Sequence, residues 1–166
     1  TQDCNGIWGG NSNCDLEVDL SLGTGANGSI DVMINSNVAI TGFQFSVSGM
    51  TLSGASGGLG DGLSAVDAGS NGVVLGYDFG SASIASTDGT YQVLTTLSGE
   101  FTDTQVCISN LVISVSSSSQ GMLDVTGDGN CGVTDYTATI SGCTDSAACN
   151  YDVSANSDDG TCTYPS

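Results

Sequence analysis

The chain contains no lysine, arginine or histidine, and this constrains it more than any other feature. Its 18 acidic side chains give a formal net charge of −18 at neutral pH. All of them are aspartate except Glu17 and Glu100. A folded form therefore carries unbalanced negative charge, which opposes compaction unless a cation binds. Because carboxylate, amide and carbonyl oxygens prefer hard cations, the composition favours calcium as that ion.

The same composition excludes several classes of function. With no cationic side chain to contact phosphates, we expect no binding to nucleic acid. Anionic membrane surfaces would repel the chain, and no apolar run is long enough to span a bilayer, so we expect no membrane insertion. Catalysis through Ser-His-Asp or Cys-His groups, or through a lysine Schiff base, is impossible. A catalytic carboxylate pair is disfavoured because both glutamates lie at or near the ends of predicted strands, and we predict no enzyme activity.

The hydrophobic pattern predicts an all-β chain. Hydrophobic residues make up 39% of the sequence, which argues against a disordered acidic tail. Polar and apolar residues alternate with a period of two, and 25 glycines supply turn signals between the alternating segments. We therefore predict an antiparallel β-sandwich, with the glycine-rich segment 53–63 as a plain connection. The predicted strands lie at 15–20, 29–34, 38–47, 50–52, 73–79, 91–97, 105–115 and 122–125.

Seven cysteines cluster toward the two ends of the chain. This density, with no CxxC zinc pattern, predicts disulfides and an oxidising, extracellular setting, and we take Thr1 as the start of a processed, secreted chain. A bridge between Cys4 and Cys14 would close a short loop at residues 1–14. A second preferred bridge joins Cys107 to Cys131. Because seven is odd, one cysteine is free or pairs with another chain.

The segments VAITGFQFSVSGMTLSGASGGL, VVLGYDF, QVCISNLVIS and LDVTGDGNC give residues 15–131 a resemblance to the cohesin-like β-sandwich of secreted, multi-module bacterial surface proteins. The resemblance implies a jelly-roll-like sandwich that is not catalytic and serves assembly at the cell surface. The family's partner-binding residues vary too much to be transferred to this chain.

Residues 142–164, GCTDSAACNYDVSANSDDGTCTY, resemble the acidic repeat GCTDxxACNYDxxAxxDDGSC of secreted marine bacterial surface proteins. The opening DCNGIWGG resembles a spacer of the same proteins. Repeats that lack the middle cysteine imply a Cys143–Cys162 bridge, which leaves Cys149 unpaired or between subunits. We therefore divide the chain into a disulfide-closed loop at 1–14, a cohesin-like sandwich at 15–131, and an acidic, Cys-rich calcium-binding module at 132–166.

Residues 124–135 resemble the calcium loop of dockerins and EF-hands. Oxygen-bearing side chains stand at positions 1, 3 and 5, glycine at position 6, and a carboxylate at position 12. Cysteine at position 8 and β-like flanks depart from that pattern. In the alternative interpretation, this stretch is the last sandwich strand followed by an Asp-Gly turn, and the two interpretations can coexist. The candidate ligands are Asp124, Thr126, Asp128, Asn130 and Asp135.

A second group of oxygen-bearing side chains lies within fifteen residues of the C-terminal repeat. A segment with so few aliphatic residues cannot form an ordinary core, so it needs a metal and a disulfide in place of one. The alternative is that these side chains form Asx turns. The candidate calcium ligands are Asp145, Asn150, Asp152, Asn156, Asp158 and Asp159.

Two functions fit this sequence. The first is a secreted, calcium-stabilised structural protein whose copies assemble into an extracellular filament or surface layer. Edge strands without lysine are protected by negative charge alone, and calcium would remove that protection. The second is a cell-surface recognition or adhesion module that binds a carbohydrate or a separate protein. Self-association in calcium alone would distinguish the first from the second.

Overall fold

The computed structural model describes residues 16–87, 89–116 and 122–165. The chain divides into two compact units, residues 1–136 and 137–166. The boundary lies five residues beyond the predicted one, because residues 131–133 form a strand of the first unit and Tyr136 packs against its core. The predicted loop at 1–14, with Cys4 and Cys14, lies outside the described residues.

The first unit contains ten strands and one short 3-10 helix in its described part. The strands are β1 (Leu16–Leu22), β2 (Ser29–Ser36), β3 (Ile40–Ser48), β4 (Met50–Ser56), β5 (Ala65–Ala68), β6 (Val73–Tyr77), β7 (Gln92–Phe101), β8 (Gln105–Val115), β9 (Leu123–Thr126) and β10 (Cys131–Val133). The helix η1 spans Gly58–Gly62. The segment predicted as a plain connection at 53–63 thus continues β4 and then forms η1.

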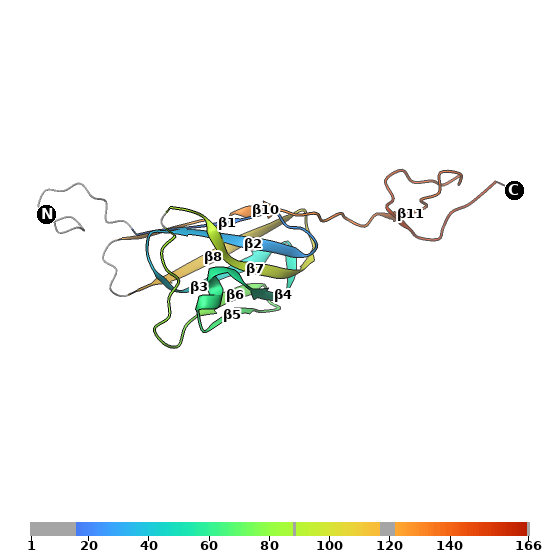
Figure 1. The fold of residues 1–166 in the computed structure, drawn as a ribbon. Helices are drawn as coiled ribbons and strands as arrows, with labels where there is room; N and C mark the ends of the chain where they lie inside the picture. Colours follow the sequence, from blue (N-terminus) through green and yellow to red (C-terminus); the bar gives the residue numbers. More distant parts are fainter. Residues whose placement is uncertain (1–15, 88, 117–121, 166) are drawn as a thin grey trace, which may run out of the picture. The chain divides into compact units, whose positions relative to one another are not determined.

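These strands form two five-stranded sheets that face each other (Figure 1). The first sheet has the order β4-β7-β2-β1-β9, and the second has the order β10-β8-β3-β6-β5. The predicted all-β sandwich is therefore confirmed. One pair departs from the antiparallel prediction, because β9 runs parallel to β1. No tight hairpin links these two strands, so no turn imposes an antiparallel direction on them.

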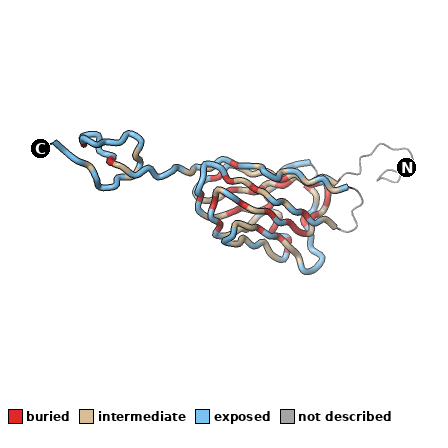
Figure 2. The backbone as a smooth tube through the Cα atoms, turned by 180° about the vertical axis from the view of Figure 1, so that it is seen from behind, coloured by how far each residue is buried: buried red, intermediate tan, exposed pale blue. Residues whose placement is uncertain are grey.

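The core lies between the two sheets, where buried residues follow the inner faces of the strands (Figure 2). In β2, Ile30, Val32 and Ile34 are buried and alternate with more exposed residues, as a period of two requires. In β3, the rings of Phe43 and Phe45 stack with centroids 5.9 Å apart. Burying each such large side chain contributes about 1.5–3 kcal/mol. This core fixes which face of each strand points to solvent.

A β-bulge sets the register between β8 and β3. Ser46 lies opposite Ser109 and Gln44 lies opposite Val112, so β8 has one more residue in this interval than β3. Asn110 has a φ of 54°, a left-handed conformation that asparagine tolerates better than most residues. As a result, Val112 and Ser114 lie beside Gln44 and Gly42. This register builds the outer surface described below.

The second unit has little hydrophobic core. It contains two short parallel strands, β11 (Ser141–Gly142) and β12 (Ser157–Asp158). Among its described hydrophobic residues, only Cys143 and Ala148 are buried. The Cys143–Cys162 disulfide closes a loop with a sequence separation of 19. A unit this small cannot bury enough apolar surface to be stable by packing alone, so the disulfide must supply much of its stability.

Candidate functional site

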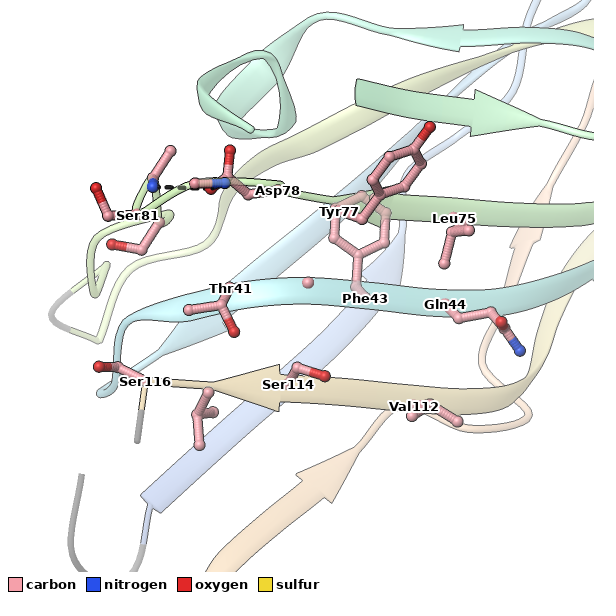
Figure 3. Close-up of a pocket in the computed structure, with 16 residues that line it drawn as sticks. Thr41, Phe43, Gln44, Leu75, Tyr77, Asp78, Ser81, Val112, Ser114 and Ser116 are labelled. Carbon is pink, nitrogen blue, oxygen red and sulfur yellow. Dashed lines mark hydrogen bonds between the residues drawn. The ribbon is translucent and has the colours of Figure 1, made fainter. Parts of the chain in front are cut away.

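A groove of about 700 Å³ crosses the outer face of the second sheet, over β8, β3 and β6 (Figure 3). Its floor follows from the cross-strand register. On the central strand β3, Gly42 lies between Tyr77 of β6 and Ser114 of β8. Because glycine has no side chain, the middle of the face is hollowed while the flanking strands carry larger residues. Gln44 continues the central row and is exposed.

Apolar side chains border this groove although they face solvent. Val112 is 56% exposed and Leu75 is 39% exposed, and they lie on either side of Gln44. Phe79, just beyond β6, is 86% exposed. Its ring meets the ring of Tyr77 edge-on, with centroids 5.0 Å apart. Apolar residues gathered on one solvent-facing sheet surface are characteristic of an interaction site.

A hydrogen-bonded loop forms one wall of the groove. Asp78 accepts a hydrogen bond from the hydroxyl of Ser64 and further bonds from the amides of Gly80 (2.7 Å) and Ala82 (3.0 Å). The bond from Ser64, assisted by those amides, lowers the pKa of Asp78 below its usual value. Asp78 therefore stays ionised at neutral pH and holds residues 78–82 in place.

A second carboxylate lies beside the groove on β5. Asp67 lies opposite Leu75 in the β5–β6 register, and it accepts a hydrogen bond of 2.9 Å from the hydroxyl of Tyr77. That hydrogen bond raises the pKa of Tyr77. The β5–β6 side of the groove is thus acidic. The opposite side carries the neutral residues Ser114 and Ser116.

A smaller groove of about 350 Å³ lies on the outer face of the first sheet. Asp19 of β1 is its best-connected carboxylate, because the hydroxyls of Thr126 and Tyr91 both donate to it. Glu17 and Asp124 lie directly opposite each other in the β1–β9 register. Within the described residues, no group of three His, Cys, Asp or Glu side chains is placed to hold a metal ion.

The first half of the predicted calcium loop forms part of a strand. Asp124 and Thr126 belong to β9, which pairs with β1. Both side chains are exposed on the outer face of the sheet, and the Thr126 hydroxyl donates to Asp19 at 2.6 Å. The interpretation as a last sandwich strand therefore describes this half of the segment.

The second half of the predicted loop bonds to other parts of the sandwich. Asp128 accepts a hydrogen bond from the amide of Leu111 (3.3 Å), and the Asn130 side chain accepts one from the amide of Leu22 (2.9 Å). Asp135 accepts a hydrogen bond of 2.8 Å from the amide of Asn27, in the turn between β1 and β2. These hydrogen bonds go to different parts of the sandwich, and the three carboxylates of the loop, all among the described residues, do not form a group placed to hold a metal ion. Calcium binding by this loop stays a prediction.

The second predicted set of ligands forms the turns of the C-terminal unit. Asn150 bonds to the backbone of 161–163, and Asn156 bonds to the amide of Ile140 and the carbonyl of Ala138. Four carboxylates each accept a hydrogen bond from the amide two residues ahead, which is the Asx-turn alternative. They are Asp145, Asp152, Asp158 and Asp159.

Two of these carboxylates have a lowered pKa. The amide of Ala147 and then the hydroxyl of Tyr164 lower the pKa of Asp145. The hydroxyl and amide of Thr161 lower the pKa of Asp159. Calcium binding here also stays a prediction, and it would have to add to these hydrogen bonds or replace them.

Both described disulfides join the cysteines that the sequence analysis paired. The Cys107–Cys131 bridge links β8 to β10, whose backbones pair at the same residues. The Cys143–Cys162 bridge closes the second unit. Cys149 is free and exposed. In the part of the chain that the structure describes, no helix is long and apolar enough to cross a membrane.

Comparison with known proteins gives little further information. No known family matches the chain, and no curated protein matches it. Among solved structures, a chain from the crystal structure of the CaDoc0917–CaCohA2 complex is similar over 72% of this chain and 99% of its own length. The identity is 14% and the TM-score is 0.45. A likeness this distant transfers neither ligands nor site residues.

The groove residues could not be recognised from the local sequence pattern. Leu75 and Val112 lie in the apolar runs 73–75 and 111–113, which indicate buried strands. A signal was present nonetheless. Phe43, Gln44 and Phe45 lie in the predicted strand 38–47, where a period of two puts the two phenylalanines on one face and Gln44 on the other. Outward-facing apolar neighbours of Gln44 could be recognised only once the strand register was known.

Proposed function

We propose that this chain is a secreted, non-catalytic recognition module that binds a protein partner across the outer face of β8, β3 and β6. The observation that carries the proposal is the groove, which combines exposed apolar side chains with a polar, hydrogen-bonded wall. Protein interfaces share this organisation, because an apolar and aromatic centre excludes water while a polar rim orients the partner. The absence of histidine and lysine supports a role without catalysis.

A substitution at the centre of the groove tests this proposal. In Val112→Asp, we expect loss of binding to a protein fragment selected from a display library of the source organism's genome. A charge at the centre of a desolvated interface costs binding free energy that the complex cannot recover. Binding would be measured by surface plasmon resonance.

The chain offers a closely matched control. Val133 on β10 is 55% exposed, against 56% for Val112, and it does not line the groove. Val133→Asp adds the same charge and should leave binding unchanged. Equal loss of binding in the two variants, or no loss in either, would rule out the groove as the binding site.

Calcium binding and assembly into a filament form a separate proposal. They are supported by the acid excess, since 18 acids and no cation favour uptake of divalent ions and disfavour contact between copies without them. The carboxylates of Asp124 and Asp128 are exposed and available to an ion. A filament held by calcium would bury such carboxylates between copies.

We expect calcium to raise the melting temperature of the chain, and the Asp124→Asn, Asp128→Asn double variant to lose that rise. A ligand that binds only the folded state stabilises it in proportion to its occupancy. Differential scanning calorimetry with calcium and with EDTA measures the effect, and light scattering on the same samples reports assembly. Asp61→Asn, Glu100→Gln removes the same number of exposed charges from η1 and β7, away from β9. If calcium raises the melting temperature of both double variants equally, the stabilisation comes from screening of the negative charge and not from a calcium site at Asp124 and Asp128.

A further inference from the structure

We infer that the partner bound at the groove is a different protein that presents lysine or arginine beside an apolar side chain, with its cation directed at the β5–β6 side. This inference rests on the proposed function and specifies the chemistry of the partner. It starts from the position of Asp67. That carboxylate lies opposite Leu75 and accepts a hydrogen bond from the hydroxyl of Tyr77. A partner that covers Leu75 and Tyr77 therefore also covers Asp67.

Covering Asp67 is costly unless a positive charge accompanies the partner. A carboxylate that loses water without a counter-charge carries a large desolvation penalty. Asp67 has one hydrogen-bond donor in the structure, the hydroxyl of Tyr77 (2.9 Å). Asp78, on the same side of the groove, already accepts three hydrogen bonds from neutral donors. The additional positive charge must therefore come from the bound molecule.

The sequence excludes this chain itself as the source of that charge. With no lysine, arginine or histidine anywhere, a second copy has no side chain to neutralise Asp67. Without a bridging cation, two copies would instead bring net charges of −18 together. The partner is therefore a separate, basic protein segment, and long-range attraction to the acidic chain would accelerate its association at low salt.

The geometry also orients the partner. The apolar residues Leu75 and Val112 lie on opposite sides of Gln44, so an apolar anchor covers the centre of the face. Among the residues that line or adjoin the groove, Asp67 and Asp78 lie toward β5 and β6, whereas the lining residues on the β8 side are neutral. The cationic residue of the partner thus lies on the β5 side of its apolar anchor.

A selection from a random peptide library on phage tests this inference. Peptides are selected on the wild-type chain at physiological ionic strength and then depleted on the Val112→Asp variant, which removes peptides that bind acidic surfaces elsewhere. We expect the remaining peptides to contain lysine or arginine near an aromatic or aliphatic residue. One such peptide, synthesised and titrated, should bind Asp67→Asn about tenfold more weakly or worse, because an interfacial charge pair is broken.

Glu17→Gln is the matched control, since it removes one exposed charge from the outer face of the other sheet. It should change the affinity by less than about twofold, because distant surface charges are screened. Groove-binding peptides without lysine or arginine, or equal effects of the two substitutions, would overturn the inference while leaving the proposed function in place. If no peptide survives depletion, and only a second copy or a glycan array binds the wild type, both proposals are wrong.

Discussion

Removal of the Cys143–Cys162 disulfide is expected to unfold residues 137–166 while the sandwich stays folded. The second unit has two buried hydrophobic residues among those described, and one of them is Cys143 itself. The bridge closes a loop with a sequence separation of 19, for which chain entropy alone gives about 3 kcal/mol. The remaining stability comes from exposed Asx turns, each of which contributes little in water. Without the bridge, these turns cannot offset the entropy of the free chain.

Hydrogen exchange measured by mass spectrometry would test this on the full chain. The change is Cys143→Ser with Cys162→Ser, made in a Cys149→Ser background so that the free thiol cannot form a substitute bridge. The Cys149→Ser chain alone is the control and should exchange like the wild type. We expect peptides covering 141–163 to lose their protection and peptides from β2 and β7 to keep theirs. Unchanged protection in 141–163 would show that the turns suffice without the bridge.

Gly127→Ala is expected to destabilise the sandwich by about 3 kcal/mol, the sum of backbone strain and a forced contact. Gly127 has a φ of 103°, which disfavours any residue with a Cβ. A Cβ at this position would also lie 2.1 Å from the carbonyl oxygen of Leu20 in β1. The turn after β9 therefore packs against the backbone of β1, and neither backbone can move without breaking the sheet.

A substitution at Gly129, two residues further on, distinguishes the calcium-loop interpretation of this segment from the interpretation as a strand followed by a turn. It also has a positive φ, of 81°, but a Cβ there would meet nothing within 4 Å. Gly129→Ala should therefore cost only the conformational penalty, about 1 kcal/mol. A calcium loop predicts the reverse order, because Gly129 stands at its sharp turn at position 6. Urea denaturation of the two variants measures the order, and a larger loss in Gly129→Ala would contradict the strand interpretation.

Several features of the fold could be predicted from local patterns. Alternation at 29–34 placed β2 because its inward residues are uniformly aliphatic. The four residues of β5 were missed, because Ala65–Ala68 is short, lies between glycine-rich segments, and has no alternation that distinguishes it from a turn. The parallel β1–β9 pair joins residues more than 100 positions apart, and no local signal specifies such a pairing.

The candidate site was less predictable than the fold. Its hollow depends on Gly42 standing between Tyr77 and Ser114, a register that the bulge at Asn110 sets. In contrast, the spacing of oxygen-bearing side chains from Asp124 onward was conspicuous in the sequence. The structure assigns three of those oxygens to hydrogen bonds with different parts of the sandwich, because the segment is a strand up to Thr126 and a turn beyond it, so its side chains reach β1 and β8 instead of surrounding one point.

The most direct measurement of the central claim is an NMR titration of the labelled full chain with a groove-selected peptide. If the groove is the recognition surface, amide shifts will change along β3, β6 and β8, with the largest changes near Gln44, Leu75 and Val112. Shifts confined to the outer face of the first sheet, or to residues 137–166, would contradict the account.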